Sequence, residues 1–204
     1  MNILFIGNSH TYYHDMPQIF KRICEKNEIA VSVTMLAHGG KGFMFHVDEP
    51  EVRFNILFGG YDYVILQHTA HPMGDLSQMK EGASRLIAWI RQAGATPVLY
   101  MTWQAKRYGY AEQKPMTDAY LHLAENHGCA VAPVGEVWWN FIAQNPEIPL
   151  FSDDGEHANA MGARLAAYTI AETIFPSKIH SVLEEDQLIL HAIKTTNTGK
   201  ESER

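Results

Sequence analysis

Three polar side chains have the types and positions needed for a hydrolytic site. Ser9 follows a short apolar run and precedes a helical pattern, where a hydroxyl meets several free backbone N–H groups, as a nucleophile requires. Asp154 and His157 are three residues apart and fit on a single turn. A serine nucleophile needs an imidazole base, and that base needs a carboxylate that fixes its tautomer. These residues predict a Ser-His-Asp triad, provided that the fold brings the late turn to Ser9.

Alternating strands and helices are predicted to supply that fold. The apolar runs are short and nearly continuous, so each strand is expected to be covered by helices on both faces and to pair in parallel with its neighbours. The sequence therefore predicts an α/β protein, a three-layer α/β/α sandwich with about five parallel strands. The expected strands are residues 2–6, 30–36, 63–67, 97–101 and 129–132. One expected helix begins near residue 15, and the others include residues 83–90, 114–127, 135–144 and 159–175.

Loops at the carboxyl ends of these strands are the expected place for a ligand, because helix N-termini and loops converge there. Asn8 and His10 flank Ser9 in the first of these loops, and Trp103 follows the fourth strand. We expect these three side chains to line a substrate pocket. The five loops of interest are residues 7–10, 38–42, 67–71, 102–103 and 152–157.

Two motifs at opposite ends of the chain resemble those of the SGNH/GDSL hydrolase superfamily. They are Ile6-Gly7-Asn8-Ser9, followed by the segment 12–17, and Asp154-Gly155-Glu156-His157 before a helix. More narrowly, residues 4–11 and 63–67 resemble an uncharacterised bacterial branch, and the resemblance runs from about residue 2 to residue 175. It implies a flavodoxin-like sandwich and a serine esterase acting on short-chain acyl esters through an acyl-enzyme. It also implies Ser9 as nucleophile, Asp154 as carboxylate and His157 as base, with no metal or organic cofactor.

The resemblance also implies an oxyanion hole, in which this chain departs from the family pattern. The backbone N–H of Ser9 and that of a glycine from the second motif normally donate, and the loop offers Gly39, Gly40 and Gly42, with Gly40 and Gly42 our candidates. The third motif normally ends Gly-x-Asn-Asp and supplies an asparagine amide. This chain instead reads Gln67-His68-Thr69-Ala70-His71-Pro72, so Gln67 and His71 are the candidates for the missing donor.

Composition limits the other classes of function. The chain has 204 residues, 46% of them hydrophobic, and a net charge of −7, with no basic block longer than Lys21–Arg22. This argues for a single hydrolase domain, residues 1–178, and against nucleic acid or an anionic membrane as partners. Residues 179–204 are expected to form a C-terminal extension with a frayed polar tail. The N-terminus lacks signal-peptide features and predicts a cytoplasmic protein.

Two other interpretations are open at this point. A non-catalytic binding domain would explain the missing asparagine, and a metal-dependent hydrolase could use the histidine cluster formed by residues such as His10, His38 and His71. The expected partner is a small-molecule or carbohydrate ester, with a carbohydrate-linked acetyl group as the preferred substrate. Its sugar platform would come from aromatic side chains among Tyr12, Tyr13, Trp103, Trp138 and Trp139. The sequence leaves the oligomeric state open.

Overall fold

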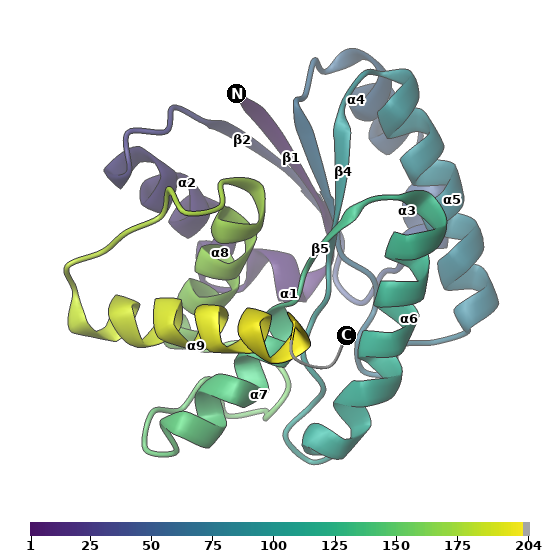
Figure 1. Cartoon of the computed structure of the whole chain (residues 1–204). Helices are drawn as coiled ribbons and strands as arrows, with labels where there is room; N and C mark the ends of the chain where they lie inside the picture. Colours follow the sequence, from purple (N-terminus) through teal and green to yellow (C-terminus); the bar gives the residue numbers. More distant parts are fainter. Residues whose placement is uncertain (202–204) are drawn as a thin grey trace.

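Five parallel strands form the centre of the molecule (Figure 1). The structure is a computed structural model that describes the backbone of residues 1–201 and the side chains of residues 1–197. The strand order is β2-β1-β3-β4-β5, the flavodoxin-like order, so the predicted three-layer sandwich is confirmed. The strands are β1 (Asn2–Gly7), β2 (Ser32–Ala37), β3 (Tyr63–Leu66), β4 (Thr96–Tyr100) and β5 (Ala130–Ala132).

Helices cover both faces of the sheet because successive strand side chains point to opposite faces. In β1, Ile3 and Phe5 pack into one apolar cluster, whereas Leu4 and Ile6 pack into the other. The first cluster is covered by α2 (Met16–Lys26), α7 (Val134–Gln144), α8 (Ala160–Ile174) and α9 (Glu184–Glu201). The second is covered by α3 (Phe43–Asp48), α4 (Pro50–Phe58), α5 (Leu76–Gln92) and α6 (Gln113–His127), and these two groups flank the sheet in Figure 1.

The helix after Ser9 differs in detail from the one expected near residue 15. A short helix, α1 (Ser9–Tyr12), and one 3₁₀ turn, η1 (Tyr13–Asp15), precede α2. Within α2 the buried side chains recur at helical spacing, at Met16, Phe20 and Ile23, which gives the helix one apolar face. The sequence pattern therefore located α2 correctly, but it did not show the break that separates it from Ser9.

The C-terminal extension is ordered further than the sequence predicted. Helix α9 buries Ile189, Ala192 and Ile193 in the core. The amide of Asn140 in α7 donates to the hydroxyls of Thr195, at 2.9 Å, and Thr196, at 2.8 Å. Thr195 and Thr196, in the polar stretch near the C-terminus, are thus held to α7 by hydrogen bonds, and fraying of the tail beyond them stays a prediction. Residues 202–204 of the predicted tail lie outside the described residues.

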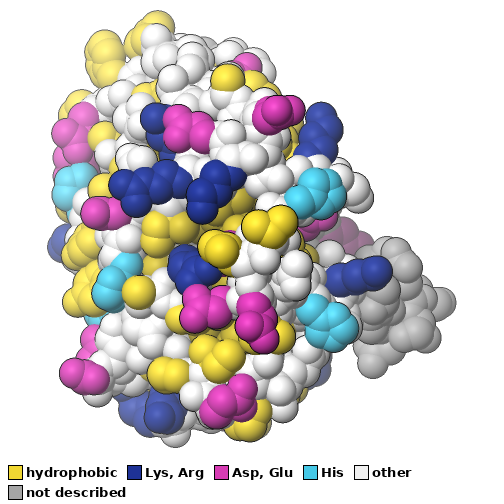
Figure 2. Space-filling view, turned by 90° about the vertical axis from the view of Figure 1, so that its left-hand side faces the viewer, with side chains coloured by type: hydrophobic (Ala, Val, Ile, Leu, Met, Phe, Trp, Pro, Cys, Tyr) yellow, Lys and Arg dark blue, Asp and Glu magenta, His cyan; other side chains and the backbone are white. Residues whose placement is uncertain are grey.

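The surface shown in Figure 2 carries charges of both signs. Basic and acidic side chains are interspersed on it, with apolar side chains between them. This face therefore presents no continuous basic surface to a polyanion. Among the described residues, no helix is both long enough and apolar enough to cross a bilayer.

The topology also locates a crevice. From β1 the chain moves outward to β2 and then returns past β1 to β3, so the connections leave β1 and β3 in opposite directions. At such a switch point the loops separate at the carboxyl ends of the strands and leave room for a ligand. The loop that follows β1 carries Ser9, and the loop that follows β3 carries His71.

Candidate active site

Ser9, His157 and Asp154 form a continuous chain of hydrogen bonds at the carboxyl end of β1. Ser9 Oγ lies 2.8 Å from His157 Nε2, and His157 Nδ1 lies 2.6 Å from Asp154 Oδ2. Because an ionised carboxylate only accepts, the imidazole proton sits on Nδ1 and Nε2 is free to accept the serine proton. The fold thus brings together residues 148 positions apart in the arrangement of a nucleophile, a base and an orienting carboxylate.

The turn that presents Ser9 requires a glycine before it. A Cβ atom at Gly7 would lie 2.3 Å from Thr11 Oγ1 and 2.5 Å from Gln67 Oε1, which is too close for any side chain. Asn8 then caps α1 by accepting from the His10 N–H at 3.1 Å. Ser9 is the first residue of α1, so its own N–H has no acceptor within the helix and remains available to a ligand.

Asp154 is fixed by the same turn that carries His157. Its Oδ1 accepts from the backbone N–H of Glu156 at 2.8 Å and from that of His157 at 2.9 Å. Desolvation would raise the pKa of this carboxyl, but hydrogen bonds from the His157 ring and the two backbone N–H groups outweigh it and lower the pKa to about 2. Asp154 is therefore ionised at neutral pH, as an orienting carboxylate must be.

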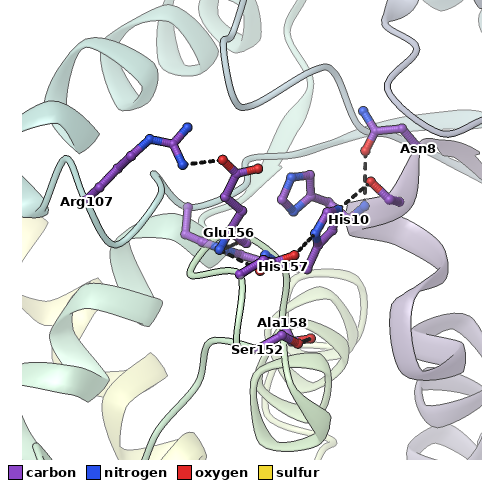
Figure 3. A network of polar contacts seen from close by, with 10 residues as sticks. Asn8, His10, Arg107, Ser152, Glu156, His157 and Ala158 are labelled. Carbon is purple, nitrogen blue, oxygen red and sulfur yellow. Dashed lines mark hydrogen bonds and ion pairs between the residues drawn. The ribbon is translucent and has the colours of Figure 1, made fainter.

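The loop after β4 fastens this turn from the other side. The backbone N–H of Lys106 donates to the Gly155 carbonyl at 2.8 Å, and Arg107 forms an ion pair with Glu156. Figure 3 shows Arg107 reaching across to Glu156 beside His157. Two loops that are distant in sequence therefore hold the base and its carboxylate in place.

Trp103 is buried completely and does not line the pocket that the sequence predicted for it. Its ring stacks on Trp138, with 3.8 Å between centroids, and its indole N–H donates to the Glu156 carbonyl at 2.8 Å. The predicted role is wrong because the side chain turns from the strand end into the core. The stacked, buried pair also removes two side chains from the expected sugar platform.

A cavity of about 300 Å³ opens beside Ser9. Asn8 and His10 line it, as the sequence predicted, together with Gly40, His71 and Glu156. A cavity of this size accepts a small group and has little room for a long hydrocarbon chain. Two larger hollows, of about 910 and 670 Å³, contain none of the three triad residues.

Comparison with known proteins agrees with this geometry. No model of a known protein family and no curated protein matches the chain. Among solved structures, a protein from Slackia heliotrinireducens provisionally assigned as an SGNH hydrolase is 25% identical, with a TM-score of 0.71 over 85% of this chain and 98% of that one. The fold is that of the SGNH/GDSL hydrolases.

Two further structures with this fold illustrate its range. A DUF4886 family protein from Bacteroides uniformis is 16% identical, with a TM-score of 0.78 over 97% of this chain and 95% of that one. The psychrotrophic esterase EstA from Pseudoalteromonas sp., solved in a form inhibited by monoethylphosphonate, is 13% identical, with a TM-score of 0.65 over 85% of this chain and 96% of that one. The fold shared with these structures covers 85% to 97% of this chain.

Of the glycines in the second SGNH motif, Gly40 faces the cavity. Gly42 packs against His68 instead, where a Cβ atom would lie 2.6 Å from the imidazole ring, and Gly39 lies beside the Tyr12 hydroxyl. Gly40 has a φ of +70°, a left-handed conformation that favours glycine. Within the described residues neither the Gly40 N–H nor the Ser9 N–H makes a hydrogen bond, so both can serve a ligand.

Gln67 does not act as the donor that the sequence predicted. Its side chain is completely buried, and its Oε1 accepts from the Asn8 N–H at 2.8 Å and from the Thr11 hydroxyl at 3.0 Å. Its amide nitrogen donates to the His68 carbonyl. The prediction is wrong because the side chain crosses to the end of β1, where it is completely buried and holds the Ser9 turn, so its amide does not line the cavity.

His71 lines the cavity, but its unpaired ring nitrogen is buried and is an acceptor, not a donor. Gln104 Oε1 accepts from the Ala105 N–H at 3.1 Å and lies 3.0 Å from His71 Nδ1, so that ring nitrogen carries the proton. Burial lowers the pKa of His71, which keeps the ring neutral and leaves a lone pair on Nε2. A lone pair cannot stabilise an oxyanion, so the predicted donor role is wrong for this tautomer.

The histidines do not assemble a metal site in the part of the chain that the structure describes, where no group of three potential ligand side chains is found. His10 instead packs edge-on against His71 and Trp103 and lies parallel to the His157 ring. Burial, together with the nearby His71 and His157, lowers the pKa of His10 well below its usual value. His10 is therefore a neutral wall of the cavity.

Two buried histidines are expected to make the stability of the fold depend on pH. Burial lowers the pKa of His46 and of His68 to about 4, whereas both titrate near 6.5 when unfolded. Their contribution to the free energy of unfolding is fully present above pH 6.5. It is lost as the pH falls toward 4, by at most about 1.4 kcal/mol per pH unit for each histidine. Urea unfolding at pH 7 and pH 5 should show the loss. His46→Gln should reduce this pH dependence, whereas His180→Gln, at an exposed position, should not. An equal loss of stability between pH 7 and pH 5 in both variants would contradict the role given to His46.

Proposed function

We propose that the protein is a serine esterase that hydrolyses short-chain acyl esters through an acyl-enzyme on Ser9. The observation that carries the proposal is the hydrogen-bond chain from Ser9 through His157 to Asp154, in a fold shared with esterases and lipases. The small volume of the cavity beside Ser9, about 300 Å³, supports a short acyl group. The proposal does not include the expected carbohydrate moiety, because Trp103 and Trp138 are buried.

The geometry supports the following sequence of steps. Ser9 Oγ attacks the ester carbonyl carbon while its proton moves to His157 Nε2, and the imidazolium formed is stabilised by Asp154. The tetrahedral intermediate expels the alcohol, which takes the proton from His157. Water then attacks the acyl-enzyme, His157 accepts its proton and returns it to Ser9 Oγ, and the carboxylic acid leaves.

The oxyanion in this scheme is held by backbone groups. Ser9 and Gly40 line the cavity and their N–H groups have no other partners among the described residues, whereas Gln67 and His71 contribute no donor. Loss of one oxyanion donor lowers turnover by about 10²–10³-fold. The family's oxyanion asparagine has no side-chain replacement among these residues. This observation favours a second candidate function, a binding domain that has the fold but no catalytic activity.

Covalent labelling separates the two candidates. Intact-mass analysis after exposure to a fluorophosphonate probe is expected to show one adduct, because His157 activates Ser9 toward phosphorus as it does toward a carbonyl carbon. The adduct should be lost in Ser9→Ala and retained in Ser84→Ala, which removes an exposed hydroxyl on α5. Absence of an adduct on the folded native protein would overturn the esterase proposal and favour the binding domain.

A further inference from the structure

The imidazole of His157 lies between two aromatic rings. The Tyr13 ring is nearly parallel to it, with 4.0 Å between centroids and 11° between planes. The His10 ring lies parallel at 5.0 Å and 21°. The triad hydrogen bonds fix the imidazole edges, and these two rings fix its faces. Tyr13 stands four residues after Ser9, so one short segment carries both the proposed nucleophile and the ring stacked on its base.

An unusual backbone places Tyr13 on His157. His14 has φ and ψ of 52° and 29°, and Asp15 has 54° and 41°, so two successive residues with a Cβ atom adopt the left-handed conformation. This conformation is uncommon for residues with a Cβ atom, although His and Asp adopt it more often than most. Immediately afterwards Met16 is buried at the start of α2. The left-handed pair thus turns the chain into α2 while Tyr13 stays against the base.

The face of the Tyr13 ring, and not its hydroxyl, makes this contact. Within the described part of the chain the Tyr13 hydroxyl forms no hydrogen bond. The contact of Tyr13 with His157 is therefore made by the ring alone. An aromatic face carries negative charge density and attracts a cation placed over it. In the scheme above, His157 becomes a cation at each proton transfer. On its other face, the neutral His10 adds packing without charge.

We propose that Tyr13 is a positioning residue for His157: its ring face holds the imidazole in the plane of the triad and stabilises the imidazolium as it forms. This inference rests on the proposed function of Ser9 and His157. It extends that function by assigning a role to a residue that the sequence offered only as one of several surface aromatics. A face-on cation interaction of this kind changes a rate by about 3- to 30-fold.

Three variants separate ring face, bulk and general stability. Tyr13→Leu, which keeps bulk but loses the ring, is expected to lower kcat for p-nitrophenyl acetate by about 3- to 30-fold, with a much smaller change in KM. Tyr13→Phe keeps the ring face and should retain most of the rate. Phe58→Leu, an exposed aromatic on α4, is the matched control and should match the native protein. Equal rates in the Leu and Phe variants of Tyr13 would overturn the proposal.

A measurement independent of catalysis completes the test. NMR of protein labelled in its histidines, with the His157 signals assigned through His157→Gln, reports the stacking directly, because protons over a ring face are shifted upfield. The His157 ring protons should move downfield in Tyr13→Leu and stay in place in Tyr13→Phe. Unmoved signals would overturn the stacking. Failure of Ser9 to take the fluorophosphonate probe would instead overturn the esterase function, and the NMR result would still decide whether Tyr13 holds His157.

Discussion

Replacing His157 by alanine is expected to lower kcat for ester hydrolysis by about 10⁵–10⁶-fold, and replacing Ser9 by alanine should cost about as much. His157 Nε2 lies 2.8 Å from Ser9 Oγ and is the base placed to take its proton. Without the imidazole the hydroxyl stays protonated and unreactive, and without the hydroxyl the imidazole has no nucleophile to activate. Initial rates with p-nitrophenyl acetate, measured on variants whose melting temperatures match the native protein, test this expectation.

The double variant sharpens the test, because residues that act as a unit give non-additive losses. Ser9→Ala with His157→Ala should be no slower than either single variant, and the remaining rate should reflect binding and the backbone donors alone. His180→Ala, which removes an exposed imidazole, should behave like the native protein. Additive losses in the double variant, or single-variant losses below tenfold, would show that the two side chains do not form one catalytic unit.

The fold was accessible from the sequence because its signals are local or depend on topology alone, whereas the pairing of Ser9 with Asp154 and His157 was inferred mainly from two motifs that resemble those of the SGNH/GDSL hydrolases. Apolar runs at strand spacing predicted all five strands to within two residues at each end. Parallel pairing then placed every strand's carboxyl end at one edge, where Ser9 follows β1. The turn of Asp154 and His157 follows α7 and no strand, so its match with Ser9 came from the family resemblance. Hydrogen bonds within that turn, from the Glu156 and His157 N–H groups to Asp154, are local as well.

The donors of the oxyanion hole could not be predicted from the sequence, because they depend on the direction in which side chains point at a strand end. Gln67 and His71 both follow β3, yet Gln67 crosses to the Asn8 N–H and His71 binds Gln104. Neither partner is close in sequence, so no spacing rule reveals it. Trp103 was misplaced for the same reason. Tyr13 left no such signal either, because α1 ends at Tyr12 and the contact with His157 depends on the left-handed turn that follows.

Two buried side chains, those of His46 and Gln67, hold the backbone just before the Ser9 N–H. The Gly7 carbonyl accepts from His46 Nε2–H at 2.9 Å, and the next N–H, that of Asn8, donates to Gln67 at 2.8 Å. Both ends of the Gly7–Asn8 peptide are thus fixed by buried side chains. A fixed peptide leaves little freedom to the Ser9 N–H that follows. Preorganised donors stabilise an oxyanion without reorganising during the reaction, so this rigidity serves the two backbone donors that face the cavity.

Replacing Asp154 by asparagine is expected to lower kcat by about 10⁴-fold while the turn keeps its shape. Asparagine Oδ1 can still accept from the Glu156 and His157 N–H groups, as Asp154 Oδ1 does at 2.8 and 2.9 Å. That arrangement turns the new amide nitrogen toward His157 Nδ1, where a carboxylate oxygen now lies at 2.6 Å. A donor facing Nδ1 favours the tautomer with its proton on Nε2, and that tautomer cannot accept a proton from Ser9.

The loss should therefore appear in chemistry and not in folding. Asp154→Asn should reduce the rate of fluorophosphonate labelling and kcat together, with a melting temperature close to that of the native protein. Asp118→Asn is the matched control, because it removes an exposed carboxylate on α6 that pairs with Lys114 at 3.0 Å, far from Ser9. A loss smaller than tenfold in Asp154→Asn would mean that the carboxylate does not set the tautomer of His157. The triad would then reduce to a serine and histidine pair whose orientation depends on its stacked rings.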